Sequence, residues 1–324
     1  MTFERPLVRA LFLFHLTLAA ACGGSENKSD TGATDGAGGG SGGSGGTGSG
    51  TPAGSGGSGA SGGSGGAGGG SVDPCAKPWP DTTNTGIPAG TPALTVIEND
   101  LHTEMDGQVF DAVELRGRLY VDHKNITIKR SLLVGDEYYA VYATESASGL
   151  TIEDSEIYSG VISPDNTTVR RCHTHAGPGM TRNDGFQFGA SHVLLEDNLF
   201  DGLAPDAGAH VDGIQDMGGT DIVFRHNWVD PSVPPADDGA VNAAIFVSPE
   251  GGAPSADVTV ECNMLLGGGS WYPLRIYNTT GSVVVRGNRF DRNFMGVPVD
   301  LVDTTVTTWE DNAYSDNNEA IPAP

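Results

Sequence analysis

The sequence predicts an all-β solenoid, a parallel β-helix, over residues 73–324. A motif recurs from residue 94 onward: apolar, any, apolar, two residues, Ser/Asn/Cys, any, apolar. Its period of two describes a short strand with one buried face, a two-residue corner and the start of another strand. The copies lie 17 residues (Ser155 to Cys172) to 36 residues (Asn227 to Asn263) apart, which predicts loops of varying length on a constant coil. The residues after the corner are Ser131, Ser155, Cys172, Asn198, Asn227, Asn263, Asn288 and Asn312.

The asparagines at this corner are expected to stack about 4.8 Å apart. Stacked amides hydrogen-bond along the pile, and we expect each Asn itself to adopt the left-handed backbone of the corner, which Asn tolerates. This pattern resembles the asparagine ladder of the right-handed parallel β-helix in the pectate-lyase-like superfamily, over about residues 94–318. The resemblance implies that the strand before each motif, together with its preceding turn, forms a substrate groove.

The N-terminal part of the chain predicts export and a tether. Residues 1–21 read as a signal peptide, with Arg5 and Arg9 before a short apolar run. The sequence Leu18-Ala19-Ala20-Ala21-Cys22 resembles the lipobox of bacterial lipoproteins, which implies a lipid on Cys22 and a place at the outer membrane or cell surface. The alternative is ordinary signal-peptidase cleavage and secretion. Residues 22–72 are rich in Gly and Ser, contain no aromatic residue and predict a flexible linker.

Charge and hydropathy exclude two classes of partner. The chain has 41 Asp and Glu against 17 Lys and Arg, a formal net charge of −24. Nucleic-acid binding requires a basic surface, so no nucleic-acid partner is expected. No apolar run after Ala21 is long enough to cross a bilayer, so membrane contact is expected only through the lipid anchor. We expect a monomer.

The cysteines fit the same register. Cys172 occupies a ladder position and is expected to point inward, where a thiol behaves as a small apolar group. Cys262 precedes its ladder Asn and is expected to face outward, about three coils away and too far for a disulfide with Cys172. Cys75 reaches Cys262 only if the segment leading into the first coil lies along the surface. No cysteine spacing typical of a metal site is present.

The best candidate for a functional site is a repeat of polar residues on two successive strands, residues 183–188 and 211–216. Counting back from the ladder aligns Asp184 with Asp212 and Gln187 with Gln215, about 5 Å apart. The alternatives are structural: Asp-Gly is common turn chemistry, and a Gln pair can form a ladder. Adjacent carboxylates repel, however, so we expect them either to share a proton, which suits acid–base catalysis, or to hold a cation such as Ca²⁺.

Other candidates surround this repeat. Arg182 and His210 come just before the two strands and are candidate bases, and Arg275, on the same strand two coils later, is a candidate for binding a uronate carboxylate bidentately or for balancing the acidic surface. Trp271 and Tyr277 flank Arg275 and are candidates for stacking on sugar rings. The weaker candidates, more typical of surface residues, are His173, His175, His123 and Lys124.

Two hypotheses about function follow. The first is a carbohydrate-active surface enzyme, chiefly a lyase for an acidic, uronate-containing polysaccharide. In it, Ca²⁺ or Arg275 neutralises the uronate and His210 or Arg182 removes the proton. A hydrolase is a further alternative, because Asn183-Asp184-Gly185 and Arg275-Ile276 are similar to two polygalacturonase motifs, although Tyr277 stands where that family has Lys. The second hypothesis is a non-catalytic module whose glutamines and aromatic residues hold a glycan.

Overall fold

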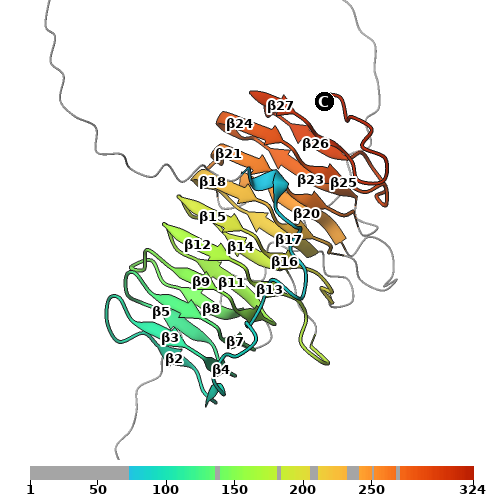
Figure 1. Cartoon of the computed structure of the whole chain (residues 1–324). Helices are drawn as coiled ribbons and strands as arrows, with labels where there is room; N and C mark the ends of the chain where they lie inside the picture. The colour runs from blue at the N-terminus through green and yellow to red at the C-terminus, as the bar shows by residue number, and fades with distance from the viewer. Residues whose placement is uncertain are drawn as a thin grey trace, which may run out of the picture. The chain divides into compact units, whose positions relative to one another are not determined.

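A computed structural model describes residues 73–135, 139–180, 184–204, 211–231, 241–249, 252–267 and 271–324. It confirms a parallel β-helix, in which the chain passes through three parallel sheets in turn and every third strand pairs (Figure 1). The signal peptide, Cys22 and the linker lie outside these residues. Among the residues described, no helix is both long and apolar enough to cross a membrane.

The three sheets run the length of the coil. Sheet A contains β1 (Thr95–Ile97), β4 (Val113–Leu115), β7 (Leu132–Leu133), β10 (Glu156–Ile157), β13 (His173–Thr174), β16 (Leu199–Phe200), β19 (Trp228–Val229), β22 (Met264–Leu265), β25 (Arg289–Phe290) and β28 (Ala313–Tyr314). Sheet B contains β2 (Leu101–His102), β5 (Leu119–Val121), β8 (Tyr139–Ala143), β11 (Gly160–Ser163), β14 (Phe186–Phe188), β17 (Val211–Asp216), β20 (Val241–Val247), β23 (Tyr272–Tyr277) and β26 (Val299–Val302). Sheet C contains β3 (Val109–Asp111), β6 (Thr127–Lys129), β9 (Thr151–Glu153), β12 (Thr167–Arg170), β15 (Val193–Glu196), β18 (Thr220–Arg225), β21 (Ala256–Glu261), β24 (Thr280–Arg286) and β27 (Thr308–Glu310).

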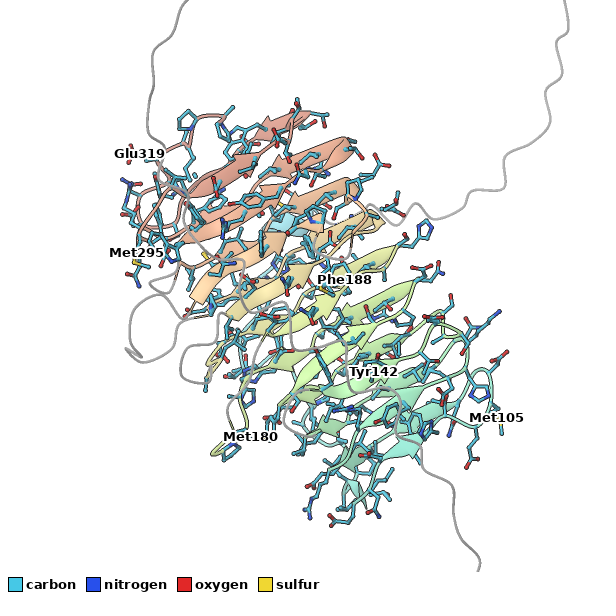
Figure 2. All side chains as sticks on the ribbon, turned by 180° about the vertical axis from the view of Figure 1, so that it is seen from behind. Met105, Tyr142, Met180, Phe188, Met295 and Glu319 are labelled. Carbon is cyan, nitrogen blue, oxygen red and sulfur yellow. A yellow bond between two sulfur atoms is a disulfide. The ribbon has the colours of Figure 1, made fainter. Side chains whose placement is uncertain are left out.

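The core lies inside the coil and is built of stacked apolar columns. On sheet B, Phe186, Ile214, Ile245 and Leu274 follow one another in register, and all four are fully buried. The alternation of the strands places one face inward, so each coil adds one apolar layer. The side chains therefore repeat in rows along the sheets, as the rear view in Figure 2 shows.

The ladder corner joins sheet C to sheet A, and its hydrogen bonds run between coils. Asn227 Nδ2 donates to the carbonyl of Leu195 (2.8 Å) and to Asn263 Oδ1 (3.0 Å). Its Oδ1 accepts from the backbone N–H (3.1 Å) and Nδ2 (3.0 Å) of Asn198. The side chain thus has partners for both donors and for its oxygen, which explains why an amide can be buried there.

The expectation that the ladder Asn itself is left-handed is wrong. The positive φ belongs to the residue before it: +58° at Asp197, +51° at His226, +56° at Cys262 and +66° at Gly287. That residue makes the turn, and the following Asn is then free to direct its amide inward along the coil axis.

One outward column of sheet C alternates in charge along the whole coil. Each member lies in register with the next and two residues before the corner residue. Glu261, 2% exposed, bonds both Arg225 (2.5 Å) and Arg286 (2.5 Å). The alternation disfavours a register in which a strand pairs with the strand two coils away, because that register would place like charges side by side. The column reads Asp111, Lys129, Glu153, Arg170, Glu196, Arg225, Glu261, Arg286 and Glu310.

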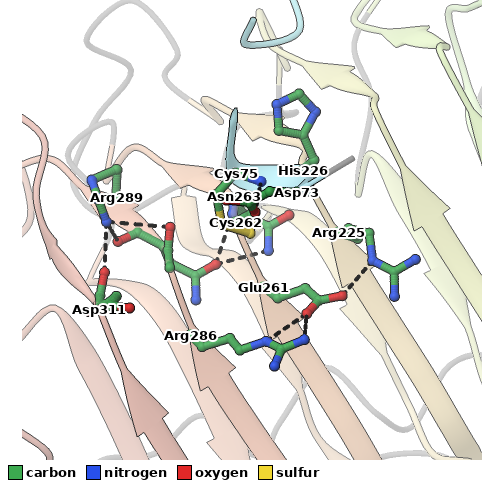
Figure 3. Close-up of a disulfide and its surroundings, with 12 residues drawn as sticks. Asp73, Cys75, Arg225, His226, Glu261, Cys262, Asn263, Arg286, Arg289 and Asp311 are labelled. Atoms are coloured by element: carbon green, nitrogen blue, oxygen red, sulfur yellow. Dashed lines mark hydrogen bonds and ion pairs between the residues drawn. A yellow bond between two sulfur atoms is a disulfide. The ribbon is translucent and has the colours of Figure 1, made fainter. Parts of the chain in front are cut away.

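The N-terminal segment lies along the surface of this corner, which is the condition for joining Cys75 to Cys262. It begins with the short 3₁₀ helix η1 (Pro74–Ala76), and a disulfide links the two cysteines with Cα atoms 4.9 Å apart (Figure 3). Further along, Lys77 binds Asp197 at 3.0 Å and Trp79 stacks on His226 at 5.3 Å.

The two remaining expectations about cysteines concern the directions in which their side chains point. Cys262 faces away from the core, but it is only 3% exposed because the N-terminal segment covers it. Cys172 points inward as expected and is fully buried, and burial raises the pKa of its thiol to about 12.

Candidate functional site

The outward face of sheet B carries one column of side chains, one from each coil. In the first three coils the column is aromatic, with His102 stacked on Tyr120 at 4.5 Å between ring centroids and Tyr120 at 6.1 Å from Tyr142. Tyr142 is 39% exposed. Polar and apolar residues follow toward the C-terminal end. In order the column is His102, Tyr120, Tyr142, Ile162, Gln187, Gln215, Phe246, Arg275 and Asp300.

Gln187 and Gln215 lie in register on adjacent coils, as the alignment predicted. Gln187 Nε2 donates to Gln215 Oε1 at 2.5 Å and approaches Asp184 Oδ2 at 3.3 Å. The hydroxyl of Tyr139 donates to Gln187 Oε1 at 3.1 Å. The two amides therefore do form a ladder, and this ladder extends to Asp184.

Asp184 and Asp212 are neighbours one coil apart. Asp184 Oδ1 accepts the backbone N–H of Asp212 at 2.8 Å, while the N–H of Gly185 donates to the carbonyl of Asp212 at 3.0 Å. The carboxylate of Asp184 thus receives a backbone and an amide donor, and both stabilise its negative charge.

Asp212 has a different environment from Asp184. Its side chain is only 4% exposed, and its Oδ1 has no hydrogen-bond partner among the described residues. Its Oδ2 is 3.5 Å from Asn242 Nδ2, a long contact. Burial, and then the charge of Asp184, raise the pKa of Asp212 well above its usual value. A carboxyl group with a raised pKa beside a second carboxyl group suits the role of a general acid.

Asn242 was not identified as a site residue from the sequence. Val211 pairs with Val241 but Asp212 pairs with Ala243, so Asn242 is the extra residue of a β-bulge. Its amide contacts Asp212, and its Oδ1 accepts a hydrogen bond from Arg275 Nη1. Asn242 therefore links the acid pair to the arginine, and a sequence alignment that began at Ala243 did not include it.

Arg275 is already engaged with several neighbours. Its Nε is 3.4 Å from Asp300 Oδ2, and it also bonds the Tyr277 hydroxyl, which in turn donates to Asp300 at 2.7 Å. Its guanidinium lies 4.6 Å from the ring centroid of Tyr272 and 5.0 Å from that of Phe246. The structure thus places Arg275 on the column but leaves it 17% exposed, with a carboxylate beside it.

The remaining predicted site residues divide into three groups. Trp271 precedes β23 and is 48% exposed, so its ring is available for stacking, whereas Tyr277 is held by Arg275 and Asp300. Arg182 and His210 lie outside the described residues. His173 belongs to β13 of sheet A and His175 directly follows this strand, and both lie near Glu156.

The acid pair supplies only part of a calcium site. Asp212 Oδ1 is open among the described residues, but one Asp184 oxygen is occupied by a backbone N–H. Calcium takes about six to eight oxygen ligands. Bound Ca²⁺ would therefore need oxygens from substrate, water or other parts of the chain, and its chemistry there would be to neutralise a carboxylate.

A hollow of about 650 Å³ lies elsewhere, beside the disulfide. Its lining includes Glu261, Arg286 and Arg289, and Glu261 is already paired with Arg286 (Figure 3). This hollow contains no unpaired acid comparable to Asp212, and we do not assign it chemistry.

No family model, no curated protein and no solved structure matches this chain.

Proposed function

We propose that the outward face of sheet B binds a polysaccharide chain and that the Asp184–Asp212 pair cleaves it. The observation that carries the proposal is Asp212: a buried acid with a raised pKa, next to a second carboxylate, on a face that also presents amides and aromatic rings. A buried carboxyl oxygen without a hydrogen-bond partner among the described residues is unusual for an acid with only a structural role.

The length of the column supports an extended ligand. Nine coils contribute one side chain each, and eight steps of about 4.8 Å span about 38 Å. Aromatic rings provide flat apolar surfaces for sugar faces, while the glutamine amides provide donors and acceptors for hydroxyl groups. A polysaccharide fits such a row better than a small compact ligand does.

The reaction that we propose is β-elimination on a uronate. A base removes the proton α to the carboxyl group, the glycosidic C–O bond at the β position breaks, and the leaving oxygen takes a proton from Asp212. His210 and Arg182 remain the candidate bases. The Gln215 amide and Arg275 are the donors that we propose for the uronate carboxylate, with Ca²⁺ as the alternative neutraliser.

We further propose that the enzyme acts as a monomer at the bacterial cell surface or outer membrane, held by a lipid on Cys22, or else as a secreted protein. The linker of residues 22–72 would then let the β-helix search a polysaccharide near the membrane.

A second candidate is a non-catalytic glycan-binding module. It is favoured by the low exposure of Asp212 and by the engagement of Arg275 with Asp300, since both reduce the contact these groups can make with a substrate. A hydrolase, with Asp212 protonating the leaving sugar, is the third candidate.

The test uses the full chain on a panel of uronate polymers. A lyase produces both the ultraviolet absorbance of an unsaturated product and new reducing ends, whereas a hydrolase produces only the reducing ends. We expect Asp212→Asn to abolish both signals and to keep polymer binding in affinity electrophoresis. A chelator in parallel reactions tests the calcium alternative.

Asp216→Asn is the matched control, because Asp216 is also a buried acid of β17 but faces the core. Full turnover by Asp212→Asn, or no binding of any polymer, would contradict the proposal. Binding without turnover by the unmodified chain would favour the non-catalytic module.

A further inference from the structure

We propose that Glu156, His173 and His175, on the outward face of sheet A, form a binding site for a divalent transition metal such as Zn²⁺. One ligand atom from each residue lies within 4.8 Å of the other two. This cluster belongs to a different sheet from the acid pair and does not depend on the polysaccharide proposal.

The β-helix register builds the cluster. Glu156 of β10 pairs with His173 of β13 on the next coil, so their side chains are neighbours on the same face. His175 lies two residues after His173 and returns to that face. The two imidazole rings stack with centroids 4.1 Å apart, and Tyr158 meets the His175 ring edge-on at 4.9 Å. The side chains are 16% (His173), 21% (His175) and 28% (Glu156) exposed, so solvent reaches the cluster.

The two polar contacts of His175 direct its Nε2 toward Glu156. Its Nδ1 is 3.0 Å from the carbonyl of Ala176, which can only accept, and this contact favours the tautomer with the proton on Nδ1. Its Nε2 is 2.9 Å from Glu156 Oε1. In that tautomer the Nε2 lone pair faces a carboxylate oxygen, an arrangement that a proton or a metal ion bridges.

The surroundings suit a metal in place of the proton. The carbonyl of Ala176 orients the His175 ring, and Asp201 Oδ1, 2.8 Å from His173 Nε2, orients the other ring. Such outer partners fix the tautomer of metal-binding histidines and raise their basicity. Asp201 fixes a proton on His173 Nε2 and leaves the lone pair of Nδ1 as a ligand. Asp201 is thus a positioning residue.

The ligand set selects the class of metal. Two imidazole nitrogens and one carboxylate suit Zn²⁺, while Ca²⁺ and Mg²⁺ prefer all-oxygen sites. Tetrahedral zinc with bonds of about 2.0–2.1 Å holds its ligand atoms about 3.4 Å apart, so the 2.9 Å contact between Glu156 and His175 must open by about 0.5 Å. Three protein ligands leave one position for water or an exogenous ligand.

The experiment titrates the full chain, stripped with a chelator, with Zn²⁺ in a calorimeter. Binding of Co²⁺ is followed in parallel by its visible absorption, which reports tetrahedral nitrogen and oxygen ligation. We expect one site, an affinity loss of more than about 100-fold for His175→Gln and for Glu156→Gln, and a smaller loss of about 10-fold for Asp201→Asn, in line with outer-shell substitutions.

His192→Gln is the control, because His192 also contacts a carboxylate (Asp221, 3.0 Å) but sits outside any three-residue cluster found among the described residues. Its variant should bind zinc as the unmodified chain does. Zinc should also raise the Tm of the unmodified chain and not that of His175→Gln, which separates lost binding from misfolding. Unchanged zinc affinity in His175→Gln, or a Co²⁺ spectrum of octahedral type, would overturn the proposal.

Discussion

The ladder corner and the outward face of sheet B are built in the same way, yet they differ in how completely their hydrogen bonds close. In both, like side chains stack one coil apart. Asn227 has partners for both amide hydrogens and for its oxygen, whereas Asp212 is almost as buried but leaves Oδ1 without a partner among the described residues. A stack in which each polar group has a hydrogen-bond partner stabilises the coil. Under the proposed function, the stack that contains Asp212 instead keeps a buried acid available for reaction.

The largest effect is expected from breaking the ladder with Asn227→Ala. This leaves the N–H of Asn198 buried without its partner and removes the hydrogen bonds of the Asn227 amide to Leu195 and Asn263. A buried N–H without a partner costs about 1–3 kcal/mol and each lost hydrogen bond about 0.5–1.5 kcal/mol, so the free energy of unfolding should fall by about 3–5 kcal/mol in denaturant titrations.

Asn227→Ser is the matched control, since Ser155 occupies the equivalent corner and its Oγ accepts the backbone N–H of Ser131 at 3.1 Å. It should restore part of the lost stability. Equal denaturation midpoints for the Ser and Ala variants would mean that the ladder side chains stabilise the coil by packing and not by hydrogen bonding.

The next effect concerns the inner side of sheet B, where Asp216 sits in a core column between Phe188 and Val247. Burial raises its pKa from 3.8 to about 6, although Gly218 N–H (2.9 Å) and Ser255 Oγ (2.7 Å) donate to it. The folded state therefore binds this proton more tightly than the unfolded state, and its contribution to stability is lost as the pH rises from about 4 to about 6. The shift corresponds to about 3 kcal/mol.

Asp216→Asn should remove this loss, because the amide oxygen can accept from Gly218 while its NH₂ group donates to the Ser255 hydroxyl. The difference in unfolding free energy between variant and parent, measured over this pH range, should shift in favour of the variant by about 3 kcal/mol. A difference that does not change with pH would show that Asp216 is ionised normally in the fold.

A smaller effect on stability is expected from Asp212→Asn, which tests the buried acid in the comparison of Asn227 with Asp212. The pKa of Asp212 is raised by burial and by the charge of Asp184, so its ionised form destabilises the fold at high pH. The variant should be more stable than the parent at alkaline pH by about 1–3 kcal/mol, the cost of a buried polar group without a partner. It should at the same time lose turnover. Identical stability at every pH would mean that solvent reaches the carboxylate freely.

The sequence predicted the parts that depend on a regular coil. The corner residues fixed the register, and with it the pairings of Gln187 with Gln215 and of Asp184 with Asp212. The same count places Glu156 beside His173, since each follows a corner residue, and it places the alternating charges of sheet C in one column. These last two features follow from the same register, but they were not predicted from the sequence.

Other parts could not be predicted because they depend on local irregularity or on distant packing. The bulge at Asn242 adds one residue without changing the apolar pattern, so Asn242 stayed hidden. The left-handed position is held by residues as different as Asp197, His226 and Cys262, and no shared residue type marks it. The path of the N-terminal segment over the corner, which joins Cys75 to Cys262, is set by contacts far away in the sequence.

The smallest effect on stability is expected from Gln215→Ala. This variant distinguishes most clearly between a stack that stabilises the coil and a stack that binds a ligand. Gln215, 6% exposed, accepts a hydrogen bond from Gln187 on the outward face, and the substitution removes this bond. The free energy of unfolding should fall by only about 0.5–1.5 kcal/mol, while polymer affinity measured by electrophoresis should fall clearly. Asn227→Ala should show the reverse, a large loss of stability with unchanged affinity in the fraction that remains folded. If Gln215→Ala instead lost as much stability as Asn227→Ala and kept its affinity, the glutamines would be a second structural ladder, and the binding face would have to be sought elsewhere.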